Sequence, residues 1–228
     1  MHSKQKKGIN SLLSCGTKGK VHSEVTPNRW EGAQRRIGIT GGIASGKSSV
    51  GNFLKEVKNL PVLDADVFAR EALEPKETLT KLVFERFGEP VKEYSNNQEI
   101  TLNRSALAKI IFGSKEEKEW LESFIHPIII NKIKKGFEKN SHFPTIVLIA
   151  PLLFEINLDK MCGEIWVVYC SKKQQLERLI KRDKLNDKEA KVIIDSQWET
   201  EKKCKLADVI LKNEANFSEC IKQINKIL

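Results

Sequence analysis

The sequence GGIASGKS at residues 41–48 constrains this chain more than any other segment. It fits the pattern GxxxxGK(S/T), in which the backbone turns around a phosphate group. An apolar stretch at residues 36–40 precedes it and can form a buried strand, and residues 49–57 can form a helix with one apolar face. A strand, a glycine loop and a helix in this order predict a nucleoside triphosphate site. The alternative is a glycine-rich turn that binds nothing.

The chemistry of the loop follows from its residue types. Glycines allow a tight turn whose N–H groups point at a phosphate, and the start of the following helix adds unpaired N–H groups and a positive dipole end. Lys47 is expected to reach the β- and γ-phosphates, and the Ser48 hydroxyl is the expected Mg²⁺ ligand.

Composition limits the class of protein. The chain has 228 residues, enough for one domain with insertions, and its apolar runs stay well short of the roughly 18 residues that a membrane span needs. Of the net charge of +9, most lies in residues 1–36, which hold eight Lys or Arg and two Glu. The rest is mildly basic, as suits a polyphosphate binder, so no specific nucleic acid is expected as a partner.

Residues 1–34 lack helical or strand periodicity and are expected to form a basic flexible tail, in which Trp30 could dock onto the domain. They have no secretory apolar region, and an organelle transit peptide is the alternative. The five cysteines are odd in number and form no CxxC, which indicates reduced thiols in a cytoplasmic protein.

Two acidic residues follow the second predicted strand, at residues 60–64. In a βαβ unit the two strands are parallel, so Asp64 and Asp66 are expected at the same sheet edge as the phosphate loop. One carboxylate there can accept a proton from a hydroxyl, and either can help to hold Mg²⁺. The alternative is an Asx turn that caps the next helix.

The remaining segments predict a P-loop α/β fold of three layers, with a five-stranded parallel sheet. Apolar segments at residues 143–150, 164–170 and 207–211 supply the other strands. The core is expected to comprise residues 35–74 and 141–228. Residues 75–140 look helical, without a comparable strand signal, and predict an acceptor-binding insertion. A polar turn is expected at residues 94–98, and the last helix is interrupted at His126-Pro127.

A charged helical hairpin at about residues 172–205 is expected to form a lid. Its first helix, residues 172–182, places Arg178 and Arg182 on one face, and its second is predicted to run from residue 188 to 205. Arginines in a lid close over the triphosphate and stabilise charge during transfer. The alternative is a solvated basic surface.

The motifs favour a small-molecule kinase over other P-loop proteins. The sequence contains no NKxD box for guanine, because residues 131–134 read NKIK, and the third strand leads into Pro151 rather than an ATPase aspartate. A kinase acting on a nucleoside monophosphate or similar acceptor is one alternative. A nucleotide-dependent nucleic-acid-binding or switch protein, suggested by the basic tail, is another.

Six segments in this order resemble the dephospho-coenzyme A kinase family: ITGGIASGKSS at 39–49, DAD with AR at 64–70, LNRSAL at 102–107, HP at 126–127, PLLFE at 151–155 and QQLER at 174–178. The resemblance covers about residues 36–228. It implies phosphorylation of the ribose 3′-hydroxyl of dephospho-CoA by Mg·ATP, the last step of coenzyme A synthesis, on a five-stranded core with a helical CoA-binding domain and a lid.

The resemblance also implies roles for individual residues. Asp66 would be the catalytic base, with Lys47 and Arg178 stabilising the transferred phosphoryl group. The acceptor site would comprise Asp64, Arg70, Arg104, His126, Pro151, Leu152 and Leu153. The ATP site would comprise Gly41, Gly42, Ile43, Ala44, Ser45, Gly46, Lys47, Ser48, Ser49, Arg182 and, by a weaker match, Asn213. ATP and dephospho-CoA are the implied partners, and the chain is expected to be a monomer.

Three positions depart from the family pattern. Ala44 stands where members usually have Gly, which a negative φ would permit, and Ser49 stands where they usually have Thr. The end of the lid reads KKCK at residues 202–205, where many members have Arg.

Overall fold

The structure, a computed structural model, describes residues 29–94 and 99–228. Most of the predicted tail therefore lies outside the described residues, as does most of a polar turn expected at residues 94–98.

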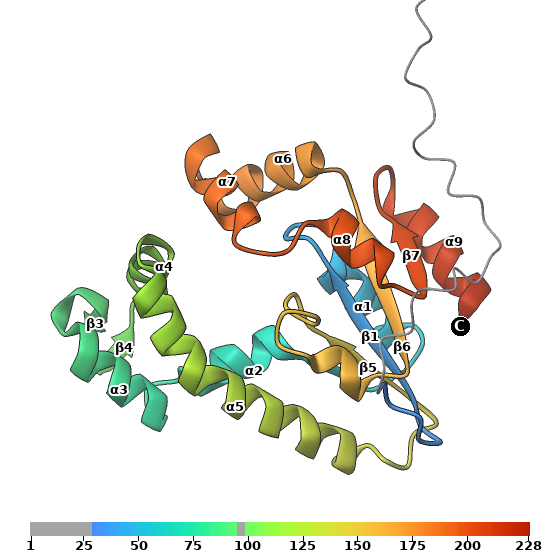
Figure 1. Ribbon diagram of the computed structural model, residues 1–228, viewed down its shortest axis with the longest axis horizontal. Helices are drawn as coiled ribbons and strands as arrows, with labels where there is room; N and C mark the ends of the chain where they lie inside the picture. The colour runs from blue at the N-terminus through green and yellow to red at the C-terminus, as the bar shows by residue number, and fades with distance from the viewer. Residues whose placement is uncertain (1–28, 95–98) are drawn as a thin grey trace, which may run out of the picture.

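The core is a five-stranded, fully parallel sheet in the order β2-β5-β1-β6-β7, as predicted (Figure 1). Its strands are β1 (Arg35–Gly41), β2 (Val62–Asp64), β5 (Thr145–Ile149), β6 (Glu164–Tyr169) and β7 (Val209–Lys212). Because parallel strands all end at one edge, the segments that follow β1, β2, β5 and β7 meet there.

Helices cover both faces of the sheet and make three layers. On one face, Ile37, Ile39 and Trp166 pack with α1 (Lys47–Glu56) and α9 (Phe217–Ile227). Alternate residues such as Leu148 and Val167 point to the other face, where they pack with α2 (Ala65–Ala72) and α5 (Lys115–Lys139). This alternation explains why the strands read as continuous apolar runs.

The insertion contains strands that the sequence analysis did not predict. Between α3 (Thr78–Phe87) and α4 (Arg104–Gly113), a 3₁₀ turn (Glu89–Val91) leads into an antiparallel hairpin of β3 (Lys92–Tyr94) and β4 (Ile100–Leu102). The expectation of a helical insertion without strands was wrong. Each strand has only three residues, too few for an alternating pattern. The pair is anchored by two buried side chains, Val91 just before β3 and Leu102 at the end of β4.

The predicted break at His126-Pro127 was also wrong, since α5 runs through it from Lys115 to Lys139. A proline inside a helix removes one hydrogen bond. Here the helix buries an apolar face at four-residue spacing, and this burial outweighs the loss: Leu121, Ile125, Ile129, Ile133 and Phe137.

The lid comprises three helices where two were predicted. They are α6 (Lys172–Asp183), α7 (Asp187–Asp195) and α8 (Thr200–Lys205). The predicted second helix breaks at residues 196–199, where the Trp198 N–H donates to Glu155 rather than to a helical carbonyl. Figure 1 shows α6 and α7 at the top of the view, with the insertion below them at the left.

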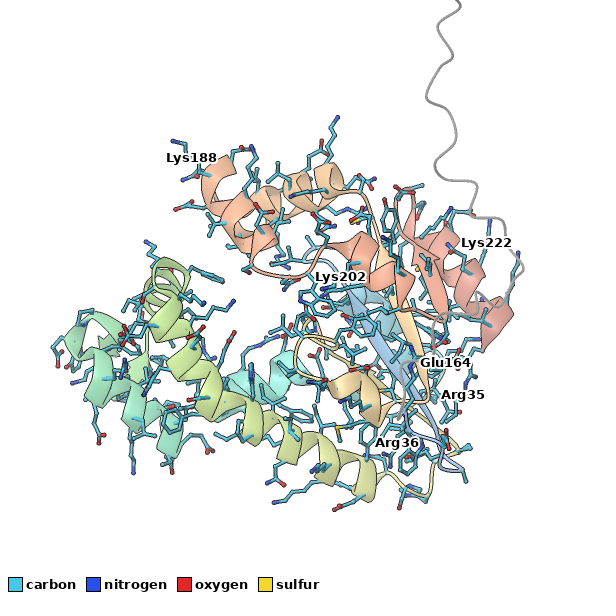
Figure 2. The ribbon with its side chains drawn as sticks, viewed as in Figure 1. Arg35, Arg36, Glu164, Lys188, Lys202 and Lys222 are labelled. Atoms are coloured by element: carbon cyan, nitrogen blue, oxygen red, sulfur yellow. The ribbon has the colours of Figure 1, made fainter. Side chains whose placement is uncertain are left out.

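The segment before β1 contacts the domain through Trp30, which packs against Arg36 of β1. The Arg36 guanidinium lies between two rings, 3.5 Å from the centroid of Trp30 and 4.1 Å from that of Phe137. The neighbouring Arg35 pairs with Glu164 of β6 at 2.9 Å (Figure 2). Trp30 thus docks onto the domain as expected. In the described part of the chain, no helix is long and apolar enough to cross a membrane.

Candidate active site

The glycine loop has the backbone that its sequence predicts. Gly41 and Gly46 have φ angles of 149° and 101°, in the region that favours glycine. A methyl group at Gly46 would also collide with the amide of Asn213. That amide donates a 2.8 Å hydrogen bond to the Ser45 carbonyl, so the end of β7 holds the loop in place.

A negative φ would permit alanine at position 44, but the φ of Ala44 is +56°. A left-handed conformation costs a non-glycine residue roughly 1–2 kcal/mol. Ala44 and Ile43 pack against the apolar cluster of the lid helices, which contains Leu179, Ala190 and Ile194. The loop and the lid therefore share one small core, which gives the alanine methyl group a contact that glycine lacks.

Lys47 is almost completely buried, at 8% exposure. Its ammonium donates to the carbonyl oxygens of Gly41 and Gly42 at 3.1 and 2.8 Å. Burial, followed by the positive charge of Lys203, lowers its pKa to about 8, while the negative charge of Asp66 opposes the shift.

A cavity of about 840 Å³ opens above the loop, and we call it the nucleotide cavity. Ten of its lining residues were predicted for ATP binding or catalysis: Ile43, Ala44, Gly46, Lys47, Ser48, Ser49, Asp66, Arg178, Arg182 and Asn213. The Arg178 guanidinium donates to the Asn213 carbonyl at 2.9 Å, which orients it. Arg182 makes a two-point contact with Asp183 at 2.7 and 2.8 Å. Both lid arginines line the nucleotide cavity.

Asp64 and Asp66 have different positions and contacts. Asp64 is the N-cap of α2, and its Oδ1 accepts the Asp66 N–H at 2.8 Å, so the capping interpretation holds for this residue. Asp66 stands in the first turn of the helix and lines the nucleotide cavity. Its side chain is exposed toward the cavity, and partial desolvation there, followed by the charge of Asp64, raises its pKa.

A second cavity, of about 350 Å³, lies between the sheet edge and the insertion, and we call it the acceptor cavity. Apolar side chains of α4 and α5 form most of its wall, and the predicted residues Arg104, His126, Pro151 and Leu152 line it. Burial lowers the pKa of His126, which favours the neutral imidazole. Asp66 lines this cavity as well.

Several predicted residues support the site without lining either cavity. Gly41, Gly42 and Ser45 form the buried base of the loop. Arg70 is exposed and donates to the Asp66 carbonyl at 3.3 Å. Leu153 is fully buried in the core, so its side chain does not face the acceptor cavity.

Sequence reasoning missed polar residues near the site. Gln197 lines both cavities. Lys203, from the lysine-rich end of the lid, is fully buried and lies 2.8 Å from Glu155. A short-range pattern does not reveal these residues, because their environment depends on partners that are distant in the chain.

The oxygen donors of the nucleotide cavity suit a magnesium ion. The Ser48 hydroxyl and the Asp66 carboxylate both line it. Over residues 29–94 and 99–228, no group of three His, Cys, Asp or Glu could hold a metal by itself. In kinase sites Mg²⁺ takes few protein ligands and is completed by phosphates and water.

Comparisons with known proteins agree with this geometry. The family model described as dephospho-CoA kinase matches residues 35–219. A dephospho-CoA kinase of Prochlorococcus marinus is 46% identical over 200 residues, 88% of this chain and 95% of the relative. One of Synechocystis strain PCC 6803 is 42% identical over 193 residues, 85% of this chain and 94% of the relative.

Solved structures show the same similarity. The dephospho-CoA kinase of Campylobacter jejuni superposes with a TM-score of 0.58 at 31% identity and covers 84% of this chain and 96% of its own. The protein TT1252 of Thermus thermophilus superposes with a TM-score of 0.68 at 27% identity, covering 86% and 97%. This chain belongs to the dephospho-CoA kinase family and is a P-loop kinase.

Proposed function

We propose that this chain transfers the γ-phosphoryl group of ATP to the ribose 3′-hydroxyl of dephospho-CoA, giving coenzyme A and ADP. The main support is that Asp66 lines both cavities, where the two substrates would meet. The nucleotide cavity supplies cationic and backbone groups for phosphates. The mostly apolar acceptor cavity suits a ligand with an adenosine and a long, weakly polar arm.

In the proposed reaction, Asp66 orients the attacking hydroxyl and accepts its proton. The Lys47 ammonium and the Arg178 guanidinium stabilise negative charge on the transferred group, as do the N–H groups at the start of α1. Arg182 closes over the phosphates with the lid. Ser48 would hold Mg²⁺, which would supply charge neutralisation on the phosphates.

Each proposed part of the chain has support in the fold. The glycine-loop core (35–74 and 141–228), the CoA-binding insertion (75–140) and the lid (about 172–205) enclose the two cavities. Cys162, Cys170 and Cys220 are buried thiols, in keeping with a reducing cytoplasm.

A coupled assay of ADP release with ATP and a panel of acceptors tests the proposal. The panel contains dephospho-CoA, AMP, CMP and pantothenate. Stimulation by dephospho-CoA alone is expected. Stimulation by AMP or CMP instead would assign the chain to nucleoside monophosphates and overturn the proposal.

A further inference from the structure

Gln197 lies where the two cavities join. It belongs to the segment between α7 and α8, and it lines both cavities together with Asp66, Pro151 and Leu152. Of these four residues, Pro151 and Leu152 offer aliphatic side chains. Gln197 and Asp66 are therefore the polar side chains that face the boundary between the phosphates and the acceptor.

The side-chain oxygen of Gln197 is buried and accepts no hydrogen bond within the described residues. A buried amide oxygen without a partner costs stability, so such groups are rare unless a ligand satisfies them. The oxygen is an acceptor only, and its partner in the complex must therefore carry an O–H or N–H group.

The backbone around Gln197 is fixed. Its own N–H donates to the Ile194 carbonyl of α7 at 3.3 Å. The next N–H, of Trp198, donates at 3.1 Å to Glu155, which also binds Lys203 of α8. The carboxamide thus projects from an anchored turn rather than from the outer part of the lid.

We propose that Gln197 is a substrate-binding residue whose Oε1 accepts a hydrogen bond from the ribose 2′-hydroxyl of dephospho-CoA. The inference rests on the proposed function. The phosphoryl oxygens of ATP offer no N–H or O–H at neutral pH, whereas the ribose of the acceptor brings two hydroxyl groups to this boundary. Asp66 engages the reacting 3′-hydroxyl, and the neighbouring 2′-hydroxyl is left for Gln197. The pair of contacts would hold the ribose for in-line attack.

The test combines a variant with a substrate lacking the group. For the wild-type protein, kcat/KM with 2′-deoxy-dephospho-CoA should be about tenfold lower than with dephospho-CoA, as expected for one neutral hydrogen bond. Gln197→Leu should show a similar loss with dephospho-CoA and no further loss with the deoxy substrate. Gln197→Glu keeps an acceptor oxygen and should still prefer the 2′-hydroxyl.

Controls separate this contact from a structural effect. Glu199→Gln alters an exposed residue of the same segment that lines neither cavity, and it should keep the full preference. The melting temperature of Gln197→Leu should be no lower than that of the wild type, because the Gln197 oxygen bonds to no described protein group and its removal breaks no contact within the protein.

Two results would overturn the proposal: an undiminished 2′-hydroxyl preference in Gln197→Leu, or no preference in the wild-type protein. Failure of the wild-type protein to phosphorylate dephospho-CoA at all would instead refute the proposed function.

Discussion

The ammonium of Lys203, which has no exposed surface, lies 2.8 Å from Oε1 of Glu155. It also donates to the Pro151 carbonyl at 2.6 Å. Burial lowers the pKa of Lys203, and the hydrogen bond and charge of Glu155 act against that shift. The last helix of the lid is therefore fastened to the segment after β5, which borders both cavities.

Removing this cation should destabilise the fold. Lys203→Ala leaves the Glu155 carboxylate buried without its charged partner, which typically costs about 3–5 kcal/mol of unfolding free energy. Urea denaturation measures the change. Lys205→Ala, at an exposed position of the same helix, is the control and should change stability by less than about 0.5 kcal/mol. Equal effects of the two variants would contradict a special role for the buried pair.

Asp66→Asn should lower kcat by on the order of 10²-fold or more while leaving ATP affinity within a few-fold, because a base acts in the chemical step. Steady-state kinetics and nucleotide titration check this. Asp64→Asn keeps an oxygen that can cap α2 and is the matched control. It should retain most activity. Activity of Asp66→Asn within a few-fold of the wild type would show that Asp66 is not the base.

The pH dependence of the reaction should report the same group. Since desolvation and Asp64 raise the pKa of Asp66, the acid limb of kcat/KM should lie above the ordinary aspartate value of 3.8. Asp64→Asn removes the neighbouring charge and should move this limb to lower pH. A limb that stays in place in that variant would argue against coupling between the two carboxyls.

Nucleotide affinity should fall at high pH. Lys47 has a pKa of about 8, so above that pH the free protein loses the charge that attracts phosphates. The affinity for ATP should therefore fall by up to about tenfold per pH unit. The unfolded chain keeps this proton up to about 10.5, so this group's contribution to the stability of the fold should rise between pH 8 and 10.5. Calorimetric titration of ATP from about pH 7 to 9.5 measures the affinity. Lys47→Arg keeps its charge and should give a flat profile, whereas a flat wild-type profile would refute the shift.

Ala44→Gly should stabilise the protein by roughly 0.5–1 kcal/mol, because glycine adopts the φ of +56° without a Cβ clash. Thermal and urea unfolding measure this. Ala108→Gly is the control, because Ala108 lies within helix α4, where glycine should lower the free energy of unfolding by about 1 kcal/mol. If Ala44→Gly is as destabilising as Ala108→Gly, the contact with the lid cluster outweighs the backbone strain.

Sequence patterns predicted the parts of the site that depend on neighbours in the chain. The glycine loop, the parallel strands and the pairing of Arg178 with Arg182 on one face all follow from short-range spacing. Asp64 and Asp66 could be placed beside the loop because a βαβ unit has one handedness.

The remaining features depend on tertiary contacts. Helix α5 passes through Pro127 because its buried face outweighs one lost hydrogen bond, and the lid helix breaks near Trp198 because Glu155 binds that N–H. Gln197 was missed because an isolated glutamine in a polar segment has no pattern. Its position between two cavities exists only in the folded chain.

The central claim is that a phosphoryl group passes from the glycine loop to a hydroxyl beside Asp66. The most direct measurement is phosphorus NMR of the product formed from ATP and dephospho-CoA. We predict one 3′-phosphorylated coenzyme A for each ADP released. Release of ADP and inorganic phosphate without a phosphorylated acceptor would contradict the account.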